Sequence, residues 1–287
     1  MNSYMKSGAL RIASCQFAVS ESVRRNARAI RRFLTKAKQA NAEIVHFSEC
    51  ALSGYAGVDF ASFDDYDWAL LKKETLGIMA LAGELGLWVV LGSTHRLTEP
   101  NWPHNCLYLI SPKGKIADRY DKRFCTPADL EYFTPGNRFV TFTLNGVKCA
   151  LLVCFDLRFP ELYRQLYGQG VQCVFQSFYN ARQRGPSVHT HIMRQTMQCH
   201  AATNHMWVSM TNSCGRYSPY PSCFIQPDGV IAEQLPLNRP SMMVNTVDLN
   251  RDFYDPMAGF REMALAGRLT NGDGDIDDPR SKDVTNI

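Results

Sequence analysis

The stretch "CALLVCFDLRFPELYRQLYG", from Cys149 to Gly168, decides the fold of this chain. It begins as an unbroken apolar run, which is typical of a strand covered on both faces. Helical periodicity follows from Pro160, a residue that suits the first turn of a helix because its missing N–H would be unpaired there anyway. Cys154 stands where the strand gives way to the turn. Its thiol would therefore emerge at the carboxyl edge of a sheet, where ligand sites of α/β folds often lie.

Strand-like runs and helical segments alternate along the rest of the chain. Helical periodicity predicts four helices, at about Val23 to Ala40, about Trp68 to Leu85, Pro160 to Tyr167 and about Thr190 to Thr203. Three glycine-containing turns, "SPKGK", "LNGVK" and "QPDGVI", predict hairpins. Strands joined by helices in one place and by hairpins in another predict mixed sheets in a layered α/β domain.

No linker divides the sequence, so we expect one domain over residues 1–267. The remainder, 268–287, reads "RLTNGDGDIDDPRSKDVTNI" and is rich in glycine and aspartate with little to bury. We expect this tail to form an extended arm.

Composition and charge are those of an ordinary soluble globular protein, with 45% hydrophobic and 20% charged residues and a net charge of +4. The basic segment from Arg24 to Gln39 carries apolar residues at helical spacing, so its cations indicate the solvated face of an amphipathic helix. A nucleic-acid patch is the alternative, but no groove-reading motif or aromatic interleaving accompanies these cations.

Ten cysteines are spread over the chain, several of them inside apolar strands. The first residues lack the apolar region of a secretory signal, and no apolar run approaches the length of a membrane span. We therefore expect a cytoplasmic protein with free thiols. Because there is no CxxC pair, and the "HTH" at His189 to His191 has no partner ligands at customary spacing, we expect no structural zinc.

A cysteine nucleophile needs a base, and Glu49 is the candidate. It ends the apolar run "AEIVHFSE", again at the carboxyl end of a strand. Partial burial would raise the pKa of such a carboxylate toward neutrality, which suits proton transfer. Taken alone, Cys154 could equally be a buried, inert thiol and Glu49 a surface glutamate in a salt bridge.

A cation that stabilises an oxyanion would complete the chemistry, and Lys122 is the candidate. It lies in "DRYDKRFCTPADLEYFTPG", ahead of a "TPG" turn. The backbone N–H of Phe155, directly after Cys154, is a second oxyanion donor. Lys122 and the turn would also lower the pKa of the thiol. Taken alone, however, Lys122 could belong to an ordinary exposed charge cluster.

Together, three segments resemble the signatures of the nitrilase, or carbon–nitrogen hydrolase, superfamily. They are "FSECALSGY", "RYDKRFCTPADLEYFTPG" and "LLVCFDLRFPELYRQL", and they match in order, approximate spacing and residue types. The resemblance extends from about Arg11 to Leu249. It implies an α–β–β–α sandwich built from two mixed sheets, usually paired into a homodimer or a higher homo-oligomer.

The resemblance also implies the site and its chemistry. Cys154 corresponds to the nucleophile, Glu49 to the general base and acid, and Lys122 to the electrostatic stabiliser of a C–N hydrolase. It implies no metal or organic cofactor, a small-molecule substrate, and neither a nucleic-acid nor a membrane partner. The family commonly carries a second glutamate ahead of the "PG" turn. The matching place here is Asp129, one methylene shorter, and Glu131 lies two residues further on.

Within the family, "CFDLRFPELYR" looks most like the small-acid amidases, such as ω-amidase and deaminated-glutathione amidase, so a small aliphatic amide is the leading substrate. An N-carbamoyl compound or a nitrile on the same scaffold remains open, as does a non-catalytic binding protein. A Cys–His hydrolase of another fold would leave Glu49 and Lys122 unexplained. Arg158 is expected to brace the turn by pairing with Asp156 or Glu161, and Arg182 and Arg184 are candidates for contact with an acidic substrate.

Overall fold

The computed structural model describes residues 8–182, 184–272, 274 and 276–285. The chain divides into one compact unit that ends at Tyr254 and a second that begins at Asp255. Among the described residues, no helix is both long enough and apolar enough to cross a membrane.

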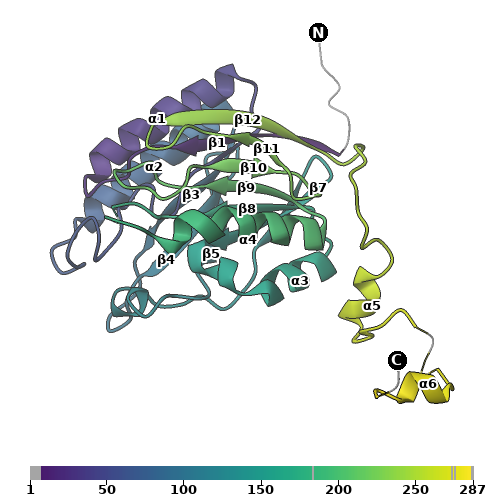
Figure 1. Ribbon diagram of the computed structural model, residues 1–287. Helices are drawn as coiled ribbons and strands as arrows, with labels where there is room; N and C mark the ends of the chain where they lie inside the picture. Colours follow the sequence, from purple (N-terminus) through teal and green to yellow (C-terminus); the bar gives the residue numbers. More distant parts are fainter. Residues whose placement is uncertain (1–7, 183, 273, 275, 286–287) are drawn as a thin grey trace, which may run out of the picture. The chain divides into compact units, whose positions relative to one another are not determined.

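The first unit contains two six-stranded sheets (Figure 1). The first sheet has the order β12-β1-β2-β3-β4-β5. Its strands are β1 (Ala9–Gln16), β2 (Ile44–His46), β3 (Trp88–His95), β4 (His104–Ile110), β5 (Ile116–Asp121) and β12 (Ser241–Asp248). The strands β1, β2 and β3 are parallel neighbours, and the other pairs are antiparallel.

The second sheet has the order β11-β10-β9-β8-β7-β6. Its strands are β6 (Thr141–Leu144), β7 (Val147–Val153), β8 (Cys173–Ser177), β9 (Trp207–Thr211), β10 (Cys223–Ile225) and β11 (Ile231–Gln234). Here β7, β8 and β9 are parallel and the outer pairs antiparallel. The three predicted hairpins join β4 to β5, β6 to β7 and β10 to β11, so the prediction of mixed sheets is confirmed.

Four long helices lie where the periodicity predicted them. They are α1 (Val23–Gln39), α2 (Trp68–Leu85), α3 (Pro160–Gly168) and α4 (Val188–Asn204). The side chains of Ser22, Asp67 and Ser187 cap the first turns of α1, α2 and α4 by accepting hydrogen bonds from backbone N–H groups. Such caps satisfy donors that have no partner within the helix.

The alternation of side chains along the strands creates the layers. Ile12 and Val90 of the first sheet pack in one core with Leu151 of the second sheet and with residues of α3 and α4. Their neighbours Ala13 and Val89 point the other way and pack against α1 and α2. Figure 1 shows α1 and α2 on one side of the stacked sheets and α3 and α4 on the other. The predicted α–β–β–α sandwich is thus confirmed.

A polar contact crosses the apolar layer between the sheets. The imidazole of His46, at the end of β2, is fully buried and lies 2.8 Å from Ser209 Oγ of β9 and 2.8 Å from Ser177 Oγ of β8. Ser177 Oγ donates to the carbonyl of Phe47, so Nε2 of His46 is assigned as the donor to Ser177, and Nδ1 accepts from Ser209. Burial lowers the pKa of His46 to about 3, and the ring is neutral.

The second unit contains two short helices, α5 (Arg261–Leu265) and α6 (Pro279–Lys282). The buried guanidinium of Arg261 pairs with Asp255 at 2.6 Å, which fixes the first turn of this unit.

Candidate active site

Cys154 occupies a strained turn. Strand β7 ends at Val153, and Cys154 begins the short 3₁₀ segment η2 (Cys154–Arg158). Its φ is 43°, in the left-handed region that residues with a side chain rarely adopt. Such conformations cost roughly 1–3 kcal/mol and persist only where the surroundings hold them. The stretch from Cys149 to Gly168 therefore turns sharply at Cys154, where the sequence changes from a strand pattern to a helical one.

A buried carboxylate holds this turn in place. Oδ2 of Asp156 accepts hydrogen bonds from the backbone N–H of Val153 at 2.9 Å and from the hydroxyl of Tyr120 at 2.8 Å. Oδ1 accepts from the backbone N–H of Phe124 at 3.0 Å. Burial raises the pKa of Asp156 to about 6. Because Phe124 lies two residues after Lys122, Asp156 ties the turn of the cysteine to the loop of the lysine.

The expectation that Arg158 pairs with Asp156 or Glu161 is wrong. The Asp156 carboxylate is occupied by the three donors above, and among the described residues Arg158 forms no ion pair. Arg158 lines the cavity that contains Cys154. Burial and then the charge of Arg158 lower the pKa of His189, which lines the same cavity.

Glu49 lies three residues after β2 and is fully buried. Oε1 accepts hydrogen bonds from Nζ of Lys122 at 2.9 Å and from Nδ2 of Asn105 at 2.7 Å. Oε2 accepts from the backbone N–H of Tyr179 at 2.8 Å, and burial, then the charge of Glu49, raise the pKa of the Cys154 thiol. The base candidate from one sheet thus meets the thiol from the other.

Lys122 directly follows β5 and is 1% exposed. Its backbone is fixed on both sides, because its N–H donates to Asn105 O at 2.9 Å and its carbonyl accepts from the N–H of Gly136 at 2.8 Å. A Cβ at Gly136 would lie 2.3 Å from the carbonyl oxygen of Asp121, so only glycine permits this close approach. The "TPG" turn therefore presses against the strand end that presents the lysine.

A second carboxylate, Asp129, completes the coordination of the ammonium. Asp129 Oδ2 lies 2.8 Å from Lys122 Nζ, and Oδ1 accepts from the hydroxyl of Tyr55 at 2.6 Å. The same hydroxyl lies 3.4 Å from Lys122 Nζ. Glu131, by contrast, is exposed and hydrogen-bonds with none of these groups. Of the two acids that the sequence left open, the structure places Asp129 at the lysine.

Asp59 holds two tyrosines of the site in position. Its buried carboxylate accepts hydrogen bonds from the backbone N–H of Tyr55 at 3.0 Å and from the hydroxyl of Tyr179 at 2.8 Å. The guanidinium of Arg182 lies 2.9 Å from the same carboxylate. Tyr55 contacts the lysine and Tyr179 contacts Glu49, so Asp59 orients both neighbours of the charged groups.

A cavity of about 570 Å³ opens onto these groups. Cys154, Phe155, Lys122 and Asp129 line it, and Cys154 is partly exposed there, whereas Glu49 lies behind its wall. The remaining walls are mainly apolar or aromatic, with Val58, Tyr132, Tyr179, Ala181 and Met193. The volume is within the range of small-molecule sites.

Charge and burial set the protonation states. Burial alone would lower the pKa of Lys122, but the negative charges around it, Glu49 first, hold that pKa well above its usual range. Burial raises the pKa of Glu49, and Lys122 offsets only part of this effect. Burial would also raise the pKa of Asp129, but Lys122 brings it below its usual value.

The thiol behaves differently from the sequence expectation. Burial first, and then the charge of Glu49, raise the pKa of Cys154 well above its usual value, and Lys122 only partly opposes them. The expectation that Lys122 and the turn lower this pKa is therefore wrong for the free protein. Two carboxylates surround one ammonium, so the cation has no excess charge with which to stabilise a thiolate.

Sequence reasoning missed three groups that contact the charged residues: Tyr55, Asn105 and Tyr179. Tyr55 closes the quoted segment "FSECALSGY", so its position was in view but its role was not. Asn105 lies within β4 and Tyr179 just after β8, where nothing in the local pattern distinguishes them from ordinary strand residues. Their contacts with Glu49 depend on how distant strands pack together, which the local sequence does not show.

Comparison with known proteins agrees with this architecture. The chain matches the carbon–nitrogen hydrolase family over residues 11–252. It is 29% identical over 219 residues to the "Hydrolase in agr operon" of Staphylococcus lugdunensis, which covers 72% of this chain and 88% of that protein. It is 26% identical over 145 residues to the 2-oxoglutaramate amidase of Bacillus subtilis (strain 168), covering 50% of this chain and 54% of that one.

A solved structure has the same fold. It is a variant of the amidase from Nesterenkonia sp. AN1 with covalent addition of the acetamide moiety of fluoroacetamide at the active-site cysteine. The TM-score is 0.74 at 21% sequence identity, and the alignment covers 90% of this chain and 95% of that one. Since the family match takes in both sheets and all three signature segments, the chain belongs to the carbon–nitrogen hydrolase family, and the resemblance inferred from its sequence is confirmed.

Proposed function

We propose that this protein is a cysteine-dependent amidase that hydrolyses a small aliphatic amide through a thioester and releases ammonia. One observation carries the proposal: Glu49, Lys122 and Cys154, distant in sequence, meet beside one small cavity. A thiol that lines a cavity and lies close to a carboxylate suits nucleophilic catalysis. Similarity to the 2-oxoglutaramate amidase of Bacillus subtilis and to the amidase from Nesterenkonia sp. AN1 supports the choice of an amide.

In the first half-reaction, Sγ of Cys154 attacks the amide carbonyl carbon while Glu49 takes the thiol proton. This order follows from the raised pKa of the thiol, which keeps the nucleophile protonated until substrate arrives. The carbonyl oxygen gains negative charge, which Lys122 and the backbone N–H of Phe155 stabilise. Glu49 then returns the proton to the amide nitrogen, the C–N bond breaks, and ammonia leaves a thioester on Cys154.

In the second half-reaction, Glu49 takes a proton from water, and the hydroxide attacks the thioester carbon. The C–S bond breaks, and the proton passes from Glu49 to the sulfur. A carboxylic acid leaves, and the thiol and carboxylate are restored. Burial raises the pKa of Glu49, so this residue accepts and returns a proton near neutrality more readily than an exposed glutamate would.

The cavity favours a short acyl chain. Its volume suits a small ligand, and its apolar walls, including Val58 and Met193, suit methylene groups. Arg158, which forms no ion pair with the described residues, lines the same cavity as the thiol, so amides that carry a carboxylate belong in the test panel beside neutral ones.

Ammonia release from neutral and acidic amides tests the proposal directly. Cys154→Ala should lose turnover by roughly 10³-fold or more while keeping its fold, because no other group forms the thioester. Cys199→Ala, which removes an exposed thiol of α4, is the matched control and should retain full activity. Turnover by Cys154→Ala close to that of the control would refute the proposed mechanism. Parallel assays with ureido compounds and nitriles distinguish an amidase from its two nearest alternatives.

A further inference from the structure

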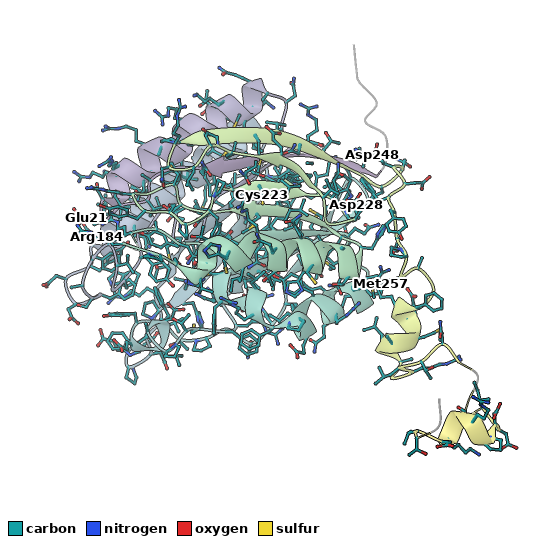
Figure 2. All side chains as sticks on the ribbon, viewed as in Figure 1. Glu21, Arg184, Cys223, Asp228, Asp248 and Met257 are labelled. Atoms are coloured by element: carbon teal, nitrogen blue, oxygen red, sulfur yellow. The ribbon has the colours of Figure 1, made fainter. Side chains whose placement is uncertain are left out.

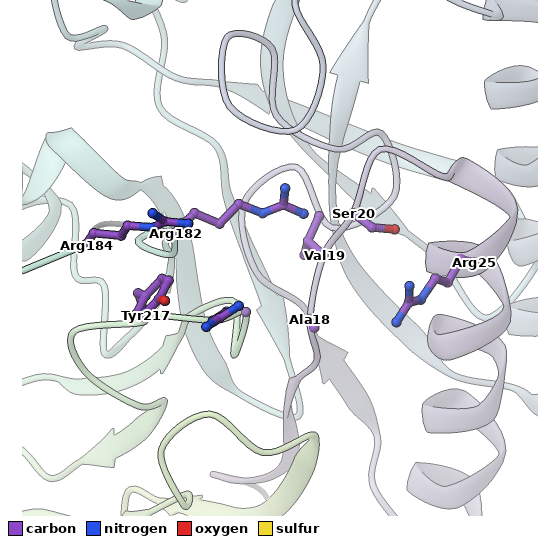
Figure 3. Close-up of a pocket in the computed structure, with 9 residues that line it drawn as sticks. Ala18, Val19, Ser20, Arg25, Arg182, Arg184 and Tyr217 are labelled. Carbon is purple, nitrogen blue, oxygen red and sulfur yellow. The ribbon is translucent and has the colours of Figure 1, made fainter.

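A second pocket, of about 370 Å³, is lined by four arginines (Figure 3). Arg25 belongs to α1, Arg182 and Arg184 to the loop after β8, and Arg216 to the loop after β9. None of the nine lining residues carries a carboxylate. The volume lies at the lower end of the range of small-molecule sites. Because four arginines line this pocket, we call it the arginine pocket.

Most of this positive charge has no partner. Arg182 pairs with Asp59, the carboxylate that also binds the two tyrosines of the active site. In the part of the chain that the structure describes, Arg25, Arg184 and Arg216 form no ion pair. Burial, and to a smaller extent the charge of Glu21, raise the pKa of Asp59, but Glu21 lines a different pocket. Three guanidinium groups that form no ion pair with the described residues therefore line the arginine pocket.

These arginines are exposed and reachable from solvent. Figure 2 shows Arg184 at the periphery of the first unit, whereas Cys223 lies in its interior. Helix α1, which supplies Arg25, contains no acidic residue, and its exposed Arg28, one turn after Arg25, adds to the positive field at this surface. A field of this kind attracts anions and raises their local concentration.

The pocket is also preorganised. The backbone N–H of Arg182 donates to the carbonyl of Arg216 at 2.7 Å and so joins the two loops. The guanidinium groups of Arg216 and Arg184 lie 4.8 and 5.8 Å from the ring centroid of Tyr217. Such cation–π contacts restrict where the two cations point. Ligand binding therefore requires little reordering of these side chains.

We propose that the arginine pocket binds the phosphoryl group of a small phosphorylated molecule. Figure 3 shows Arg25 reaching from the helix on one side of Ala18–Ser20, with Arg182 and Arg184 on the other side. Donors that come from different directions match a tetrahedral phosphoryl group better than a planar carboxylate. A phosphoryl group also carries about two negative charges, against one for a carboxylate. Guanidinium forks suit phosphate oxygens in geometry as well as charge.

Calorimetric titration with inorganic pyrophosphate tests the proposal without relying on amidase activity. We expect the wild-type protein to bind pyrophosphate at low ionic strength, and added salt to weaken the binding. The double variant Arg184→Ala, Arg216→Ala should bind at least roughly 10-fold more weakly, because it loses two charge-assisted contacts. The matched control is Lys72→Ala, Lys73→Ala, which removes the same charge from exposed positions of α2 and should bind as the wild type does.

Three results would overturn the proposal. They are no measurable binding at millimolar pyrophosphate, equal affinity of the Arg184→Ala, Arg216→Ala variant and the wild type, or binding of succinate as tight as that of pyrophosphate. Circular dichroism verifies the fold of each variant. Should the double variant not fold, Arg25→Ala provides the same comparison from α1, where its exposed side chain forms no hydrogen bond with any described residue.

Discussion

Replacement of Glu49 by glutamine should make Cys154 react faster with a thiol reagent and at the same time abolish turnover. Burial first, and then the charge of Glu49, raise the pKa of the Cys154 thiol. Two unit charges about 4 Å apart interact by about 4 kcal/mol at an effective dielectric constant of about 20. The pKa of Cys154 should therefore fall when the carboxylate becomes an amide.

The expected rate follows from this shift. At a pH below the pKa of the thiol, losing a repulsion of about 4 kcal/mol raises the thiolate fraction by about 1,000-fold. Thiolate nucleophilicity falls with pKa, with a Brønsted coefficient of about 0.4–0.5, and this removes up to half of the gain on a logarithmic scale. We therefore expect Glu49→Gln to react roughly 30-fold faster than the wild type. Lys122 acts in the same direction, because its charge is less neutralised in the variant.

Methyl methanethiosulfonate is a suitable reagent because it is small and is not an amide. Peptide mass spectrometry measures the modification of Cys154, with the exposed Cys199 as the internal reference. Glu84→Gln removes the same charge from an exposed position of α2, outside the cavity, and should react as the wild type does. A rate for Glu49→Gln equal to or below that of the wild type would refute the conclusion that Glu49 keeps the thiol neutral.

Three further substitutions test the supporting groups. Asp129→Ala should lower the free energy of unfolding in denaturant by about 2–4 kcal/mol, because the buried ammonium loses one of two carboxylates, whereas Glu131→Ala should change it little. Asp59→Ala should lower kcat more than it changes KM, since the two tyrosines behind the charged groups lose their common acceptor; an unchanged kcat would exclude this role. Asp156 has a pKa raised to about 6, so the folded protein holds more protons there than the unfolded chain between about pH 4 and 6. Relative to Asp156→Asn, the wild type should thus lose about 3 kcal/mol of stability as the pH rises through that window, and parallel pH–stability curves would contradict this.

The sequence predicted the layers and the helices well because both depend on local periodicity. The helix predicted at about Trp68 to Leu85 has these bounds in the structure. Helix α1 ends one residue earlier than predicted, and α4 begins two residues earlier and ends one residue later. Apolar runs covered on both faces identified the central strands, and glycine turns identified the hairpins. These signals are fixed by residues close to one another along the chain.

The site was harder to predict because its contacts are long-range. Asp129 and Glu131 differ by two positions, and only the short 3₁₀ segment η1 (Asp129–Glu131) decides which one faces the lysine. Arg158 was assigned a local partner, but three donors from elsewhere already occupy Asp156. The pKa of the thiol depends on burial and on a carboxylate from the other sheet, and neither is encoded near Cys154.

The buried imidazole between the sheets has a consequence for reaction geometry. The proposed base follows a strand of one sheet and the proposed nucleophile a strand of the other, so their separation depends on how the two sheets are registered. A slip of one residue along a strand, about 3.3 Å, would break the hydrogen bonds of the buried His46 ring to Ser177 and Ser209. The hydrogen bonds to Ser177 and Ser209 thus resist shear between the sheets, and a residue that touches no substrate keeps the reacting atoms at a constant spacing.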